Sequence, residues 1–254
     1  MNLIDSHCHL DFPEFDADRQ SLFEECKRQG IQRFIVPGVT ADTWDRLDLL
    51  NANYPECFIA HGLHPCFIEH HKVEHLETLK QRLALGKSVA VGEIGLDFYV
   101  KELDRNKQIE TFAAQLKLAQ AFKLPVILHV RKAHDEVIKR LKEINTTGGI
   151  VHAFNGSLQQ AHSYMALGFK FGFGGALTWP NANHLRSLAQ TLPLESLVLE
   201  TDSPDMPAYN HKQKRNTPLS VLSVVETLES LRKESIKIIA KQTTKNVAEL
   251  FSLV

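Results

Sequence analysis

Hydrophobic residues recur along the chain in short runs that alternate with longer amphipathic stretches. The short runs have the length of buried strands and are rich in valine, isoleucine and phenylalanine, which is typical of strands covered on both faces. They predict eight strands, at residues 3–5, 34–36, 57–63, 88–96, 125–130, 149–154, 169–175 and 197–202.

The stretches between the runs carry apolar residues at helical spacing. Residues 105–122, for example, place Ile109, Phe112 and Leu116 on one face. Strands that alternate with helices favour a parallel sheet, because each parallel crossover needs a returning helix. Eight such units predict a single-domain α/β protein with a TIM-like (β/α)8 barrel, and an open doubly wound sheet is the alternative. The predicted helices are residues 16–29, 40–50, 75–85, 105–122, 134–144, 158–167, 183–192, 217–231 and 236–253.

Length and composition are those of an ordinary soluble enzyme. The 254 residues, 43% hydrophobic and 23% charged, fit one barrel domain over residues 1–254. No apolar run approaches the ~20 residues of a membrane span, and the N-terminus has no signal-peptide pattern, so a cytoplasmic location and no membrane partner are expected.

Four cysteines without a CxxC spacing are expected to be reduced thiols, and a monomer is the default. The net charge of −1 gives no general attraction to nucleic acid, so a polyanionic substrate needs a local basic patch or a metal ion.

Ionisable residues stand where several of the predicted strands end. Catalytic groups in barrels come from the carboxyl ends of the strands, and imidazole with carboxylate suits zinc, manganese and similar ions. Each residue alone also fits a structural role, such as a buried ion pair or a helix cap. Their placement on five strands favours a metal centre. The six candidate ligands are His7, His9, Glu93, His129, His152 and Asp202.

Seven segments, in order between residues 4 and 207, resemble the TatD-type metal-dependent deoxyribonucleases of the amidohydrolase superfamily. The resemblance implies a TIM-like barrel, metal-dependent hydrolysis and cleavage of phosphodiester bonds in DNA. The LETDSPDMP ending and the compact size look most like the YjjV-type branch of the family. The segments are IDSHCHLD, GLHP, VGEIGLDF, LPVILHVRKA, IVHAFNGS, FGFGGALTW and LETDSPDMP.

The resemblance also implies how the ligands divide between two divalent ions, with zinc, magnesium and manganese all open as their identity. Two cations lower the pKa of a shared water molecule and stabilise the attacking and leaving oxygens. Asp202 is then a candidate to orient that water and accept its proton. The implied ligands are His7, His9 and Asp202 for one ion, His129 and His152 for the other, and Glu93 as the bridge.

Further residues are candidates for contact with the substrate. His64, after the third run, is a candidate for phosphate contact or proton transfer, with a structural role as the alternative. Arg131 and Lys132 follow the fifth run and are expected to contact phosphate. The long loop 203–216 is expected to lie over the catalytic mouth. Its basic residues, with solvated charge as the alternative role, are His211, Lys212, Lys214 and Arg215.

Acidic residues near the candidate ligands are expected to orient them. Glu200 lies two residues before Asp202 on the same run and so should face the same interior side. It is expected to orient a ligating histidine, as carboxylates behind metal ligands often do. Asp5 and Asp97 are candidates for the same role, and bonding to the backbone is their alternative.

The leading hypothesis from the sequence is a divalent-metal-dependent hydrolase, a deoxyribonuclease that acts on DNA or another phosphodiester through metal-activated water. An amidohydrolase-type esterase, amidase or deacylase acting on a small molecule or an acylated nucleotide is the alternative, because the same metal pair polarises a carbonyl. A catalytically idle scaffold is the third hypothesis. The intact set of candidate ligands argues against it.

Overall fold

The computed structural model describes residues 1–211 and 215–253. All eight predicted strands are present, and a helix follows each of them. The strands are β1 (Leu3–Asp5), β2 (Ile31–Pro37), β3 (Cys57–His61), β4 (Ser88–Asp97), β5 (Val126–Arg131), β6 (Gly149–Val151), β7 (Phe169–Phe173) and β8 (Leu197–Leu199).

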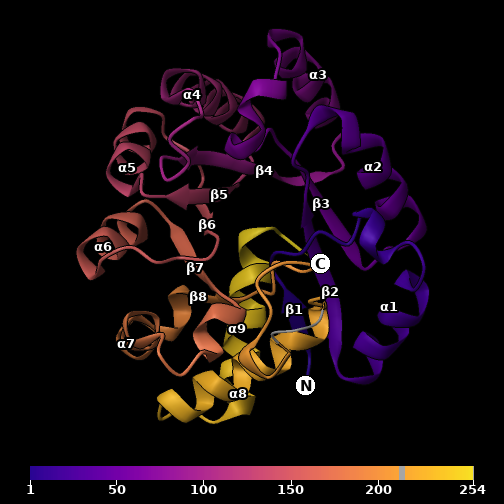
Figure 1. Ribbon diagram of the computed structural model, residues 1–254, viewed down its shortest axis with the longest axis vertical. Coiled ribbons are helices and arrows are strands. Elements are labelled where there is room, and N and C mark those ends of the chain that lie inside the picture. The colour runs from indigo at the N-terminus through magenta and orange to yellow at the C-terminus, as the bar shows by residue number, and fades with distance from the viewer. Residues whose placement is uncertain (212–214, 254) are drawn as a thin grey trace.

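The helices lie outside the strands, as Figure 1 shows. None of the described helices is both long and apolar enough to cross a membrane. They are α1 (Arg19–Arg28), α2 (Trp44–Asn53), α3 (Val73–Ala84), α4 (Arg105–Phe122), α5 (His134–Glu143), α6 (Leu158–Ala166), α7 (Asn183–Thr191), α8 (Val221–Leu231) and α9 (Ile236–Leu250).

The strands form one parallel sheet in chain order, from β1 to β8. Hydrogen bonds then join the two edge strands. The backbone N–H of Ser6, just after β1, donates to Leu199 O in β8 at 2.9 Å. The carboxylate of Asp5 accepts from Thr201, at 3.1 Å from its backbone N and 2.6 Å from its Oγ1. The sheet is therefore the predicted, nearly closed barrel, and the open-sheet alternative is wrong.

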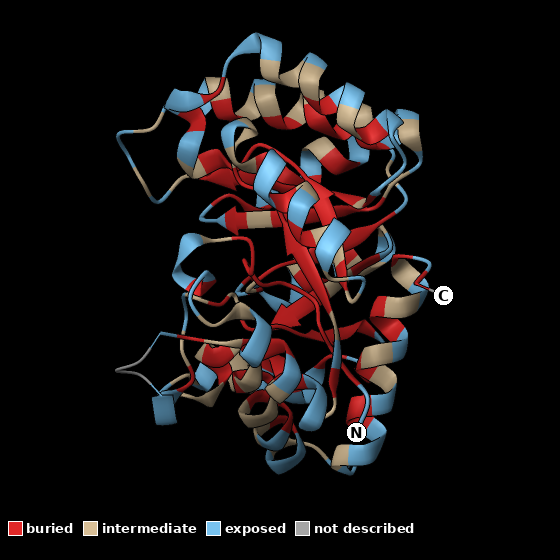
Figure 2. Ribbon diagram, turned by 90° about the vertical axis from the view of Figure 1, so that its right-hand side faces the viewer, coloured by how far each residue is buried: buried red, intermediate tan, exposed pale blue. Residues whose placement is uncertain are grey.

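Two apolar layers hold the barrel together. The larger layer lies between strands and helices and includes Trp44, Phe112 and Phe171, each almost fully buried. The smaller layer fills the amino-terminal part of the barrel, where strand residues such as Ile35 pack with Phe251 from the end of α9. Figure 2 shows buried strands inside helices whose outer faces are exposed. Each large apolar side chain so buried contributes ~1.5–3 kcal/mol. The far, carboxyl-terminal end is left for the site.

Several strand ends differ from the prediction, and the differences fall at the site. β1, β6 and β8 end before His7, His152 and Asp202, so these residues lie in the loops that leave the strands. β4 continues to Asp97, because its last residues keep pairing with β5 as far as Arg131. The expectation that Glu93 ends its strand is therefore wrong, and Glu93 lies within β4 at a register shift between Val91 and Ile94.

Candidate metal centre

The loop after β1 presents two histidines to one side. The side chain of Cys8, between them, points away, and its thiol donates to Ile35 O at 3.7 Å. The rings of His7 and His9 lie 5.1 Å apart between centroids. Their Nε2 atoms stand 3.6 and 3.4 Å from Oδ1 of Asp202, in the loop after β8. Three potential ligands thus face one point.

Glu93 stands at the centre of the cluster with its side chain 3% exposed. Its Oε2 lies 3.0 Å from His7 Nε2 and 3.7 Å from His9 Nε2. Its Oε1 lies 3.2 Å from His129 Nδ1 and 3.3 Å from His64 Nε2. The two oxygens of one carboxylate therefore face histidines on two different sides.

Asp202 and His152 complete the group. Oδ1 of Asp202 faces His7 and His9, while its Oδ2 lies 3.6 Å from His152 Nε2. The His152 ring stacks on that of His7, with centroids 3.8 Å apart. One ligand atom each from His7, Glu93 and His152 lies within 4.8 Å of the others. The six candidate ligands expected from the sequence thus converge at one end of the barrel.

The chemistry of this cluster fits divalent cations. Both ring nitrogens of His7 are buried, and neither makes a hydrogen bond of good geometry to any described residue, although Glu93 Oε2 lies 3.0 Å from Nε2. Leaving such an atom unsatisfied costs ~1–3 kcal/mol, and coordination to a cation removes that penalty. Imidazoles combined with carboxylates are the ligands of zinc and manganese sites.

The electrostatics keep the two carboxylates of the cluster ionised, while neighbouring carboxylates, against the effect of burial, raise the pKa of His9, His129 and His152, so that a cation would have to displace protons from these imidazoles. Burial disfavours ionisation of Glu93, but the charges of His7 and His64 outweigh it and hold the pKa of Glu93 well below its usual range. The pKa of Asp202 is likewise lowered against burial, mainly by His152. Burial lowers the pKa of His7, and His152 adds to the shift. Ionised carboxylates and neutral imidazole are the forms that coordinate a cation.

Two carboxylates behind the histidines fix their orientation. Oε1 of Glu200 lies 3.0 Å from His152 Nδ1 and accepts from the backbone N–H of Ala153 at 2.7 Å. His129 Nε2 donates to Asp97 Oδ2 at 3.0 Å. Burial opposes the ionisation of Asp97, but this hydrogen bond outweighs it and the pKa of Asp97 falls to about 2. Carboxylate behind imidazole is the usual arrangement around ligating histidines.

The backbone is strained where it leaves three of the site-bearing strands. Lys132, Ala153 and Asp202 have φ angles of 56°, 43° and 57°, in the left-handed region. Such conformations cost ~1–3 kcal/mol for residues other than glycine and cluster at functional sites. Here they accompany the turns that aim side chains into the mouth of the barrel.

A cavity of about 570 Å³ opens over the cluster, and two of its lining residues, Asp205 and Met206, belong to the loop after β8. Arg131 lines this cavity and also a second, adjoining one of about 840 Å³. Lys132 lines the second cavity. The guanidinium of Arg131 stacks over the exposed ring of Tyr99 at 3.7 Å.

The basic residues of the long loop lie elsewhere. His211 and Arg215 line a different cavity, near α1 and α8, and not the one over the cluster. Arg215 forms an ion pair with Asp18, at 2.6 Å between Nη2 and Oδ2. Lys212 and Lys214 fall outside the described residues. The structure therefore favours the alternative role of solvated charge for His211 and Arg215, because Asp18 holds Arg215 away from the site.

Reasoning from the sequence missed Cys66, which was expected to be an ordinary reduced thiol. It lies among His64, His129 and Asp97, and its thiol donates to Asp97 Oδ2 at 3.4 Å. The available signal was its position two residues after His64. That spacing carries no weight without the short 3-10 helix Pro65–His70, which brings both side chains to one side.

The chain resembles a well-populated group of proteins. A family model described as TatD related DNase matches residues 4–252. An Escherichia coli K12 protein named uncharacterized metal-dependent hydrolase YjjV is 41% identical, with 98% of each chain covered. Uncharacterized metal-dependent hydrolase YabD of Bacillus subtilis is 33% identical, with 99% of each covered. The crystal structure of E. coli YjjV, titled a TatD homolog, has a TM-score of 0.96 at 40% identity, covering 99% of this chain and 98% of that one.

Proposed function

The chain belongs to the TatD family and is a metal-dependent hydrolase of that family, and from this premise we propose that it cleaves phosphodiester bonds in DNA. One observation supports the proposal above others. Glu93 directs its two oxygens at histidines on opposite sides, as a carboxylate shared by two cations would. Two-cation sites are typical of enzymes that cleave phosphodiesters by in-line displacement.

The residues divide between two cations as the geometry of Glu93 and Asp202 suggests. His129 and His152 would hold the second ion, and Glu93 would be shared between the two. When bound, the cations lower the pKa of a water molecule and neutralise charge on the phosphate. The first ion would be held by His7, His9 and Asp202, whose ligand atoms lie within 4.8 Å of one another.

Asp202 and His64 act on the attacking water molecule and on the phosphate. The side chain of Asp202 is 17% exposed and lines the cavity, so its carboxylate is open to water from that side. It orients the attacking water and accepts its proton. His64, also at the cavity wall, lies within reach of a phosphate oxygen beside Glu93. It donates a hydrogen bond there or moves a proton to the leaving oxygen.

The adjoining cavity supports an extended substrate. Arg131 belongs to both cavities, so a phosphate beside it lies between the metal centre and the second space. Lys132 and His184 line that space, and the exposed Tyr99 ring offers a stacking surface. Cationic groups with an aromatic ring suit a nucleotide chain. A small ester would need only the first cavity, so the second favours DNA over the small-molecule alternative.

The test is an incubation of purified protein with labelled single-stranded DNA, with manganese, magnesium or zinc, and with EDTA. Cleavage that depends on metal and is lost in Asp202→Asn is expected. Asp42→Asn, which changes an exposed carboxylate on the α2 side, serves as the matched control and should keep full activity. Equal nicking by wild type and Asp202→Asn would mean contamination. Hydrolysis of small esters or amides without any DNA cleavage would replace the proposal with the deacylase alternative.

A further inference from the structure

Two glutamine side chains of α4 are buried within the protein. Gln108 and Gln115 are each 1% exposed and lie on the buried face of the helix together with Phe112. They are seven residues apart, close to two helical turns, so both side chains point to the same side. A buried amide is costly unless its donor and acceptor atoms find partners. The partners therefore indicate what these two side chains do.

Each glutamine binds both backbone polar groups of one residue. The backbone N–H of Asp97 donates to Gln108 Oε1 at 2.8 Å, and Gln108 Nε2 donates to Asp97 O at 3.1 Å. The backbone N–H of Leu63 donates to Gln115 Oε1 at 2.7 Å, and Gln115 Nε2 donates to Leu63 O at 3.1 Å. The same pair of hydrogen bonds thus occurs twice along one face of α4.

The two bonded residues lie where a strand has lost its neighbour. β3 ends at His61, whereas β4 continues to Asp97. The backbone N–H of Phe98 donates to Arg131 O in β5 at 2.8 Å, so the N–H and C=O of Asp97 face the opposite side, where β3 has ended. Leu63 comes two residues after the end of β3. The two amides of α4 therefore replace strand partners at this place.

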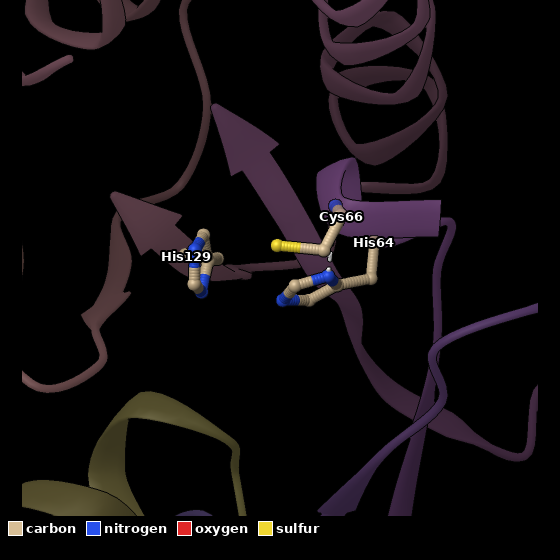
Figure 3. A group of neighbouring side chains, drawn as sticks. All are labelled: His64, Cys66 and His129. Carbon is tan, nitrogen blue, oxygen red and sulfur yellow. Dashed lines mark hydrogen bonds between the residues drawn. The ribbon is translucent and has the colours of Figure 1, made fainter. Parts of the chain in front are cut away.

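Both contacts lead to imidazoles of the site. Leu63 immediately precedes His64, and Asp97 accepts from His129 Nε2 at 3.0 Å. Figure 3 shows the rings of His64 and His129 side by side, and their centroids are 4.4 Å apart. Both rings face the same oxygen of Glu93, Oε1, at 3.3 Å from His64 Nε2 and 3.2 Å from His129 Nδ1. One helix thus supports the two imidazoles on this side of Glu93.

We propose that Gln108 and Gln115 are positioning residues of the site, which fix the places of His129 and His64. Gln108 acts through Asp97 on His129 and so sets the affinity for the second cation. Gln115 acts through the backbone on His64 and so sets the contact with phosphate. The inference rests on the proposed function, which assigns His129 to the second cation and His64 to the phosphate. The two glutamines should therefore govern two different binding steps.

The test is metal and phosphate binding by the full chain carrying Gln108→Met or Gln115→Met. Methionine has a similar length and forms neither hydrogen bond. Manganese is added to the metal-free protein, and the free ion is counted by its electron paramagnetic resonance signal. Inorganic phosphate is then titrated calorimetrically into the manganese-loaded protein. Neither measurement requires turnover.

Each variant is expected to change one measurement. Gln108→Met should bind one of two manganese ions at least ~10-fold more weakly and the other as wild type does, because loss of support behind a ligating histidine costs that much. Gln115→Met should keep both manganese affinities and bind phosphate about 10-fold more weakly, because a hydrogen bond to a charged group contributes that much. A general loosening of the barrel would not separate the two effects.

Asn246→Leu is the matched control. Asn246 is a buried amide of α9 that donates to Leu194 O at 2.9 Å and to Leu197 O at 2.7 Å, at the amino-terminal end of β8. Its replacement also removes two hydrogen bonds to the backbone, but at the end of the barrel away from the site. It should lower stability and leave manganese and phosphate binding unchanged.

Several results would overturn the proposal. They are wild-type manganese affinities in Gln108→Met, wild-type phosphate affinity in Gln115→Met, and equal losses in Asn246→Leu. Should a methionine variant fail to fold, Gln108→Asn or Gln115→Asn, one methylene shorter than glutamine, takes its place with the same expectations.

Failure of the proposed function would look different. Wild type that takes up one manganese ion would refute the two-cation centre itself, and this is seen before any substitution. A protein that shows the expected pattern and cleaves no DNA would keep the two positioning residues and refute the proposed function.

Discussion

A single methyl group on β7 should weaken metal binding without touching a metal ligand. Gly172 pairs with Val198 of β8, and a Cβ at this position would lie 1.9 Å from Oε2 and 2.4 Å from Cδ of Glu200. Van der Waals contact needs ~3.5 Å, so in Gly172→Ala the carboxylate of Glu200 must leave its place. The carboxylate is buried and holds both His152 and the backbone N–H of Ala153.

The magnitude follows from what Glu200 holds. Loss of a carboxylate behind a ligating histidine lowers metal affinity by about 10- to 100-fold, or ~1.4–2.8 kcal/mol. The backbone N–H of Ala153 is then left without an acceptor, which costs a further ~1–3 kcal/mol of stability. Gly172→Ala should therefore bind manganese at least ~10-fold more weakly and unfold roughly 2–12 °C lower than wild type.

The assay is calorimetric titration of manganese into metal-free protein, combined with thermal unfolding followed by circular dichroism. Glu200→Gln should reproduce the loss of affinity, because it weakens the same contact to His152. Gly86→Ala is the control, since Gly86 has a φ of 70° and nothing within 4 Å of its Cβ position. It should lose stability and keep its metal affinity. Wild-type affinity in Gly172→Ala would refute the reasoning.

Three further predictions concern other parts of the molecule. Glu93→Gln should lower turnover by ~10²–10⁴-fold, because the shared carboxylate is worth several kcal/mol, while Glu143→Gln, an exposed change at the end of α5, should have no effect. Near-normal activity of Glu93→Gln in a metal-saturated assay would remove its bridging role. Burial lowers the pKa of His61 to about 4, so below the ordinary histidine pKa the unfolded chain binds a proton that the folded protein does not, and the protein becomes less stable as the pH falls. In urea unfolding, wild type should lose about 2 kcal/mol more stability than His61→Asn when the pH falls from 7 to 5. Equal losses in the two proteins would contradict this. Arg131→Met should weaken DNA binding and make the slope of log binding constant against log salt concentration about one unit less steep, with no change in the hydrolysis of a small phosphodiester. An unchanged slope would exclude a phosphate contact.

The barrel was predictable because each of its strands is a short apolar run between helical patterns. The runs at residues 88–96 and 125–130, for example, have the length and composition of buried parallel strands. The strand ends were less predictable, because they depend on where side chains replace the sheet as partners of the backbone. β8 ends at Leu199, since Thr201 and Asp202 turn back to bond with Asp5 and His7.

The candidate ligands could be found in the sequence because they recur at the ends of the runs, but their mutual contacts could not. Alternation along a strand placed His7 and His9 on one side, and the structure has them so. The environment of Cys66 depends on a 3-10 helix that no periodicity indicates, and Arg215 is held aside by Asp18 at a sequence separation that no local pattern reveals.

The most direct measurement of the central proposal is anomalous diffraction from crystals grown with manganese, a hard cation that avoids the thiol of Cys66. Two anomalous peaks are expected, one on each side of Glu93. One should lie among His7, His9 and Asp202, and the other beside His129 and His152. Peaks that lie away from Glu93, or protein crystals saturated with manganese that show no peak at this end of the barrel, would contradict the two-cation centre.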